Sequence, residues 1–138
     1  MTVVWTCPNC SRPFGKKNQG HTCSPGMTVK EYFATGPPFE KPIHDEVVPF
    51  LTALGPMIVE YVQVGVFLKA KRTFAELRPL TKWVNLTFHL GREVKDPQIQ
   101  KAMNYAPGRW YYTVRLKTPD DVTDEVRGWL AEAWEFCS

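Results

Sequence analysis

Hydrophobic and polar residues alternate strictly in two stretches of this chain, residues 83–90 and 109–116. Successive side chains of a strand point to opposite faces, so each stretch predicts a strand with one face in the core and one polar face. Residues 58–71, interrupted by Gly65, and residues 73–78 predict further strands. The polar face of the resulting sheet is called the open face below.

Apolar spacing and capping residues predict helices at residues 28–33, 44–54, 96–103 and 118–134. The second helix is expected to begin near residue 44, because a proline such as Pro49 is tolerated in a first turn. Together these elements predict an α+β fold, a mostly antiparallel sheet of four to five strands with helices packed on one face. One buried cluster is expected to contain Leu86, Phe88, Trp110, Val114, Trp129 and Leu130.

The length and composition are those of one soluble globular domain with a small appendage. The chain has 138 residues, of which 43% are hydrophobic and 22% charged. No apolar run approaches the ~20 residues that a membrane-spanning helix needs, and no export signal is recognised. We therefore expect a cytoplasmic protein without a membrane partner.

Four potential metal ligands stand close together near the start of the chain: Cys7, Cys10, His21 and Cys23. Their Cys-x2-Cys-x10-His-x-Cys pattern predicts a closed, tetrahedral, structural Zn²⁺ site with no position open for water. Coincidence or a disulfide pair are the alternatives, although secreted disulfide scaffolds usually carry more cysteines. Cys137 is expected to be a free thiol, with a role at the metal as the alternative.

The same spacing limits how the metal-binding segment can work. His21 and Cys23 are two residues apart, which places them on one face of a strand but on different sides of a helix. A helix that reads DNA bases, as in Cys2His2 fingers, is therefore disfavoured. We divide the chain into a zinc-binding finger, residues 1–27, and an α+β domain, residues 28–138. A short linker at residues 24–26 follows the last metal ligand, within the first of these units.

Positive charge is concentrated in the middle of the chain. The net charge is +3, yet residues 58–117 contain eleven Lys and Arg against four Asp and Glu, and residues 118–138 contain one against six. Basic and aromatic side chains together suit a nucleic-acid backbone and its bases. The candidate ligand-binding residues on the open face are Lys69, Lys71, Trp83, His89, Arg109, Tyr111 and Arg115.

No catalytic motif is recognised, and no catalytic residue is assigned. The first hypothesis is a zinc-stabilised module that binds nucleic acid or another phosphate-bearing ligand. The second is a module that binds a protein partner or a small ligand. For the open face itself, the alternative to a binding role is that the finger or the N-terminal helix packs on it, or that its residues are ordinary solvent-facing strand residues. The third is an enzyme that uses His89 for acid–base chemistry, which rests only on the position of this residue beside Arg and Tyr.

Four segments of the chain also carry a resemblance to a known family: residues 5–23, 67–71, 83–86 and 118–130. They are similar to the bacterial family catalogued as domain of unknown function 5655, in members that have an N-terminal zinc knuckle. The finger and the C-terminal helix are the most specific parts of the resemblance. It implies a cytoplasmic α+β domain with bound zinc, and it implies no activity.

Overall fold

The computed structural model describes residues 3–21, 23 and 26–138, so the predicted linker lies partly outside the described residues. In chain order its elements are β1 (Trp5–Thr6), β2 (Pro13–Phe14), α1 (Val29–Ala34), α2 (Glu40–Thr52), β3 (Ile58–Val62), β4 (Gly65–Lys69), β5 (Thr73–Pro79), β6 (Val84–Leu90), β7 (Ile99–Ala106), β8 (Arg109–Leu116), the 3₁₀ helix η1 (Pro119–Asp121) and α3 (Asp124–Phe136).

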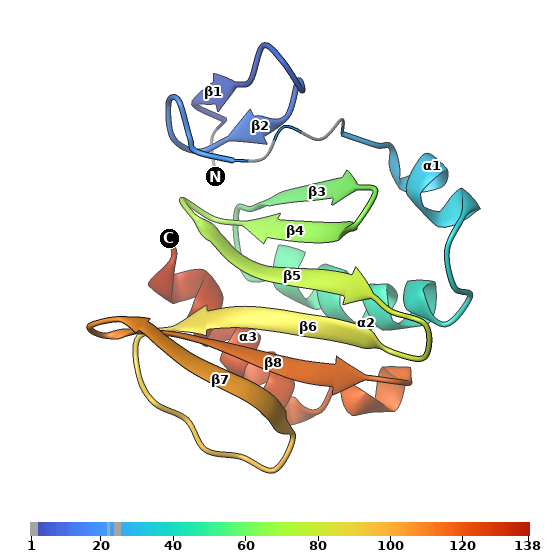
Figure 1. Cartoon of the computed structure of the whole chain (residues 1–138), viewed down its shortest axis with the longest axis vertical. Coiled ribbons are helices and arrows are strands. Elements are labelled where there is room, and N and C mark those ends of the chain that lie inside the picture. The colour runs from blue at the N-terminus through green and yellow to red at the C-terminus, as the bar shows by residue number, and fades with distance from the viewer. Residues whose placement is uncertain (1–2, 22, 24–25) are drawn as a thin grey trace.

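An antiparallel sheet of six strands in the order β3-β4-β5-β6-β8-β7 forms the centre of the molecule. Helices α2 and α3 lie behind it, and the small β1–β2 sheet lies beside β3 and β4 (Figure 1). The predicted α+β class, with helices on one face, is confirmed. None of the helices in the described residues has the length and hydrophobicity that a membrane span requires.

The strands β6 and β8 form the centre of the core, as their alternation predicts. The apolar positions of β6 are fully buried, and the positions between them are half-buried. Phe88 stacks on Trp129 of α3 at a centroid distance of 5.7 Å, and Leu86 and Val114 face each other across the β6–β8 ladder. Five residues of the predicted cluster are buried, and Trp110 packs against them half-buried.

Residues 99–106 form a strand, where a helix over residues 96–103 was expected. Asp96 does cap a turn, since its side chain accepts a hydrogen bond from the Gln98 amide at 2.9 Å. That turn is single, and the following residues pair with β8 through a hairpin with Gly108 at φ +67°. Most side chains of β7 are exposed, so this edge strand lacks the alternation by which a half-buried strand is recognised. It adds one strand to the four or five expected.

Two helices begin at different residues from those expected. Helix α2 begins at Glu40, with Pro49 inside it on the exposed side, where water can replace the hydrogen bond that the proline removes. Thr118 and Asp121 form the predicted capping box, but this box caps the N-terminus of the short 3₁₀ helix η1 and not that of the long C-terminal helix. Helix α3 starts only at Asp124, where the Thr123 side chain accepts a hydrogen bond from the amide of Val126.

The outer edge of β3 is partly covered by Met27, the last residue of the finger as divided above. The amide of Met27 donates a hydrogen bond to the carbonyl of Tyr61 at 2.8 Å, which forms an isolated antiparallel bridge. Near the same end of the β3–β4 hairpin, Gly65 lies so close to β5 that an added Cβ would come within 2.3 Å of the Leu77 carbonyl oxygen. A side chain at position 65 would therefore push the two strands apart.

Candidate metal centre and binding surface

The four predicted ligands converge at the end of the β1–β2 hairpin. Their ligand atoms all lie within 4.8 Å of one another. The sulfurs of Cys7 and Cys23 are 3.7 Å apart, and the Nε2 atom of His21 lies 3.4 Å from the Cys10 sulfur and 3.3 Å from the Cys23 sulfur. These separations fit ligand atoms placed tetrahedrally around one ion at bond lengths of about 2.0–2.3 Å. The four residues are therefore close enough to hold a metal ion.

The turn that carries the first two cysteines stabilises thiolate. Ser11, with φ +60°, closes the turn through a hydrogen bond from its amide to the Cys7 carbonyl at 2.8 Å. Burial opposes ionisation of Cys7, but hydrogen bonds from the backbone at Cys10 and Asn9 and from the side chains of Cys10 and His21 lower its pKa to about 6. A thiolate is the form that binds metal.

The imidazole of His21 is oriented by the backbone. Its Nδ1 atom lies 2.6 Å from the carbonyl oxygen of Gln19, which can only accept a hydrogen bond, so Nδ1 carries the proton and donates. The Nε2 atom is then left unprotonated toward the three sulfurs, as in metal-ligating histidines. Phe14 packs against the ring at a centroid distance of 4.3 Å, and Trp5 at 5.9 Å.

A buried ion cluster joins the finger to the open face of the main sheet. Glu60 of β3 accepts a hydrogen bond from Nε of Arg12 and another from Nζ of Lys69 at 3.2 Å. The three side chains are only 4%, 7% and 5% exposed, in that order. Burying charges costs several kcal/mol per ion unless they are closely paired. The cluster thus connects Arg12 of the finger with Glu60 of the main sheet, two residues that are 48 positions apart in the sequence.

Aromatic rings enclose both cations of this cluster. Nζ of Lys69 lies 3.9 Å from the centre of the Phe14 ring, and it donates to the Pro13 carbonyl at 3.5 Å. The guanidinium of Arg12 lies over Phe14 and Phe67, at 5.6 and 5.5 Å. Burial lowers the pKa of Lys69, although Glu60 acts in the opposite direction.

The open face of β6, β8 and β7 lies beyond the finger, and we call it the uncovered face. The guanidinium of Arg115 lies 4.4 Å from the centre of the Trp83 ring, and Nζ of Lys101 lies 5.7 Å from that of Tyr111. The Nδ1 atom of His89 is 3.1 Å from the hydroxyl of Tyr105. The uncovered face therefore carries pairs in which a basic side chain contacts an aromatic ring, and these pairs lie over three neighbouring strands.

The predicted ligand-binding residues fall into two groups. Trp83, His89, Tyr111 and Arg115 lie together on the uncovered face, with Arg109 exposed at the start of β8. Lys69 lies on the same side of the sheet, but the finger covers it, and Lys71 is exposed in the turn after β4. The structure therefore separates these two lysines from the other five residues.

Two residues of the uncovered face, Lys101 and Tyr105, were missed from the sequence. Lys101 lies in the segment that was expected to be a helix, residues 96–103, and Tyr105 lies just after it, where no strand was expected. Burial and the charge of Arg72 lower the pKa of His89, which favours its neutral form. His44 of α2 is buried, with Nε2 2.7 Å from the Tyr61 hydroxyl and Nδ1 2.9 Å from a carboxylate oxygen of Asp45.

The family described as a domain of unknown function (DUF5655) matches residues 29–137 of this chain. The chain belongs to the DUF5655 family. Its DUF5655 region contains all three α-helices and the six-stranded sheet, so Glu60, Lys69 and the uncovered face lie within it. The Cys/His cluster precedes the DUF5655 match. Neither the curated proteins nor the solved structures gave a match to the chain.

Proposed function

We propose that the finger binds one structural Zn²⁺ ion, and that the protein is a non-catalytic module that binds single-stranded nucleic acid on its uncovered face. Three thiolates and one imidazole are a ligand set that suits Zn²⁺ and leaves no position for a substrate. The small apolar cluster of the finger, in which Cys7, Cys10 and Phe14 are buried against Trp5, supports a folding role for the metal.

The observation that carries the nucleic-acid proposal is the pairing of cations with rings on the uncovered face. Arg115 with Trp83 and Lys101 with Tyr111 combine a phosphate-binding charge with a flat surface for a base. Stacking on an aromatic side chain is worth about 1–3 kcal/mol per base and tolerates any sequence. A twisted sheet surface without a groove-reading helix favours single strands over duplex.

The proposal is tested by titrating the zinc-loaded protein with fluorescent single-stranded and duplex oligonucleotides at several salt concentrations. Single strands are expected to bind more tightly than duplex, with an affinity that falls as salt rises. Binding no tighter than about 10⁻⁴ M for either form would overturn the proposal, because nonspecific attraction alone gives that affinity. The hypothesis of a protein-interaction module would then take its place.

Variants separate the contribution of charge from that of stacking. Arg115→Glu is expected to weaken binding and to reduce its salt dependence, because a phosphate contact is lost. Tyr111→Ala and Trp83→Ala are expected to weaken binding with the salt dependence nearly unchanged. Lys30→Glu is the matched control, since Lys30 is exposed on α1 and makes the same change of charge away from this face. An equal effect of the control would refute a localised site.

The finger is expected to add a contact of its own. Lys16 and Lys17 are exposed in the loop after β2, and Arg12 is buried in the ion cluster. Lys16→Glu should therefore lower affinity for oligonucleotides while the zinc content of the protein stays at about one per chain. Metal analysis of the same samples checks the second part, and a loss of zinc would show that the substitution acts through the fold.

A further inference from the structure

A row of three polar side chains crosses the open face of the main sheet. Glu76 of β5 lies opposite Thr87 of β6, and Thr87 lies opposite Thr113 of β8. The neighbours of each residue along its strand are buried in the core, so the three side chains point to the open side. All three are half-buried, and they place hydrogen-bonding groups side by side on three neighbouring strands.

The row lies between the two rings that are proposed to stack bases. Tyr111 and Arg115 are four residues apart on β8, and Arg115 lies against the ring of Trp83. At about 3.3 Å per residue this separation is about 13 Å, several times the ~3.4 Å between neighbouring stacked bases. A strand that stacks on both rings therefore has at least one nucleotide between them, and this nucleotide passes over Thr87 and Thr113.

The two threonine hydroxyls keep hydrogen-bonding capacity. The Oγ1 atoms of Thr87 and Thr113 lie 3.3 Å apart, so one hydroxyl donates to the other. Because a hydroxyl has one donor and two acceptor positions, the pair keeps a donor and several acceptor positions. Within the described part of the chain, no further hydrogen bond involves either hydroxyl. The free positions suit a ligand group that both donates and accepts.

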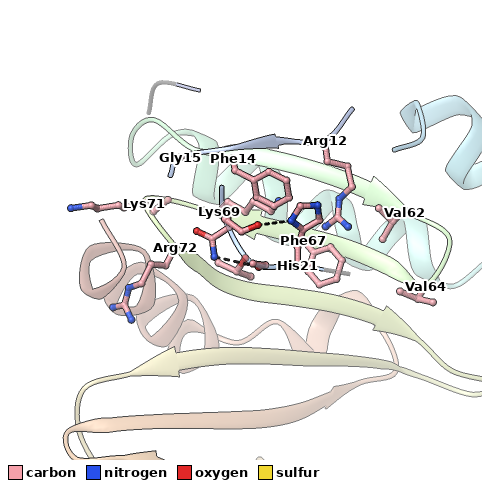
Figure 2. Close-up of a pocket in the computed structure, with 14 residues that line it drawn as sticks. Arg12, Phe14, Gly15, His21, Val62, Val64, Phe67, Lys69, Lys71 and Arg72 are labelled. Carbon is pink, nitrogen blue, oxygen red and sulfur yellow. Dashed lines mark hydrogen bonds between the residues drawn. The ribbon is translucent and has the colours of Figure 1, made fainter. Parts of the chain in front are cut away.

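The row ends where the finger begins. Across the β4–β5 ladder, Glu76 lies opposite Phe67. The Phe67 ring lines a cavity of about 430 Å³ between the finger and the sheet, together with Arg12 and Lys69 (Figure 2). Both of these cations bind Glu60. Glu76 thus lies at the boundary between the covered and the uncovered parts of the open face.

The carboxylate of Glu76 does not suit a surface that binds phosphate alone. Among the described residues it makes no hydrogen bond or ion pair, and burial raises its pKa, although the charge of Arg78 acts in the opposite direction. A phosphate group near Glu76 would be repelled. A sugar hydroxyl would instead donate to it, as the ribose 2′-hydroxyl does to the acidic residue of dinucleotide-binding folds.

We propose that the strand bound on the uncovered face is RNA rather than DNA, and that Glu76, Thr87 and Thr113 recognise the 2′-hydroxyl of a ribose between the two stacked bases. This inference rests on the proposed binding of single-stranded nucleic acid. The 2′-hydroxyl donates to the carboxylate and accepts from the free threonine donor. Deoxyribose lacks this group, so bound DNA would cover the polar row without giving it partners, which weakens binding.

Three unstructured oligonucleotides of one sequence test the inference: RNA, DNA, and RNA with 2′-fluoro sugars, which keep the ribose pucker but cannot donate. They are titrated into the full chain in the presence of added Zn²⁺. RNA is expected to bind about tenfold more tightly than DNA, the ratio that one hydrogen bond of about 1.4 kcal/mol produces, and the 2′-fluoro strand is expected to bind like DNA.

The outcomes separate this inference from the function on which it rests. Equal affinities for RNA and DNA, or a 2′-fluoro strand that binds like RNA, would overturn the recognition of the hydroxyl and leave single-strand binding in place. Binding of all three strands no tighter than about 10⁻⁴ M would overturn both.

The ratio of RNA affinity to DNA affinity locates the contact, because a general loss of stability weakens both ligands alike. Thr87→Val combined with Thr113→Val removes both hydroxyls at strand positions that valine favours, and should lower the ratio from about ten to about one. Thr73→Val is the matched control, since Thr73 is exposed at the start of β5 and outside the row. It should leave the ratio unchanged.

Glu76→Met should move the two ligands in opposite directions. DNA is expected to bind more tightly because a repulsive charge is gone, and RNA less tightly because the acceptor of its hydroxyl is gone. Glu125→Met is the matched control: Glu125 is exposed on α3, so the same change of charge there should shift both affinities equally. If the ratio stays near ten in both Glu76→Met and the double threonine variant, the inference is refuted.

Discussion

Replacing Glu60 by Gln should detach the finger from the sheet. The side chain of Glu60 is 4% exposed and is the shared partner of Arg12 and Lys69. Removing one partner of a buried ion pair typically costs about 3–5 kcal/mol, because the remaining charge stays buried without compensation. Here two like charges would remain together. Both cations can return to water if the finger lifts away, so the loss of global stability is limited to the free energy of docking.

The measurement is amide hydrogen exchange of the protein in the presence of added Zn²⁺, combined with denaturant unfolding. Exchange is expected to speed up at Met27, whose amide bonds to β3, while the amides of β6 and β8 keep their protection. Glu132→Gln is the matched control, because the pair of Glu132 with Arg92 is exposed and is worth less than about 1 kcal/mol. If the finger of the Glu60→Gln variant stays docked and stability changes by less than about 0.5 kcal/mol, the argument about the buried cluster is wrong.

Three other outcomes are expected. Phe88→Ala should cost about 3–5 kcal/mol in denaturant unfolding, since the ring is fully buried against Trp129, and a change below about 0.5 kcal/mol would contradict the assigned core. Burial raises the pKa of Glu40 above its usual 4.5, so the charged form of this side chain opposes folding. Glu40→Gln can still accept the hydrogen bond from Tyr32, and it should stabilise the folded protein at pH 7. This gain should vanish below pH 4.5, where the carboxyl group is protonated in both the folded and the unfolded state. A pH-independent gain would refute this cause. Burial also raises the pKa of Cys137, so its thiol should react with a disulfide reagent only on unfolding, as mass spectrometry can check.

The sequence predicted those parts of the fold in which burial differs between neighbouring positions. Residues 84–90 lie between two strands with one face in the core, so their alternation was strict and the strand was found. Residues 99–106 lie at the sheet edge and are mostly exposed, so their sequence shows no alternation of hydrophobic and polar positions by which a strand could be recognised. Their strand pairing depends on β8, a contact that local propensity cannot indicate.

The candidate sites show the same division between local and distant information. The metal ligands all lie within seventeen residues of one another, and spacing alone indicated that they converge. The contact of Arg12 with Glu60 joins two parts of the chain whose relative position only the tertiary structure determines. Lys69 was correctly placed on the open face, but nothing near it in the sequence indicates that the finger covers it.

The position of Met27 beside β3 has a consequence for self-association. A strand at a sheet edge offers unpaired amides and carbonyls to other chains, and among the described strands of the main sheet the edges are β3 and β7. Met27 occupies part of the β3 edge, whereas none of the described residues pairs with the outer edge of β7. Two copies that join through β7 use up this edge in both, so growth stops at a closed dimer. Release of the finger would expose all of the β3 edge, and a chain with two free edges can polymerise.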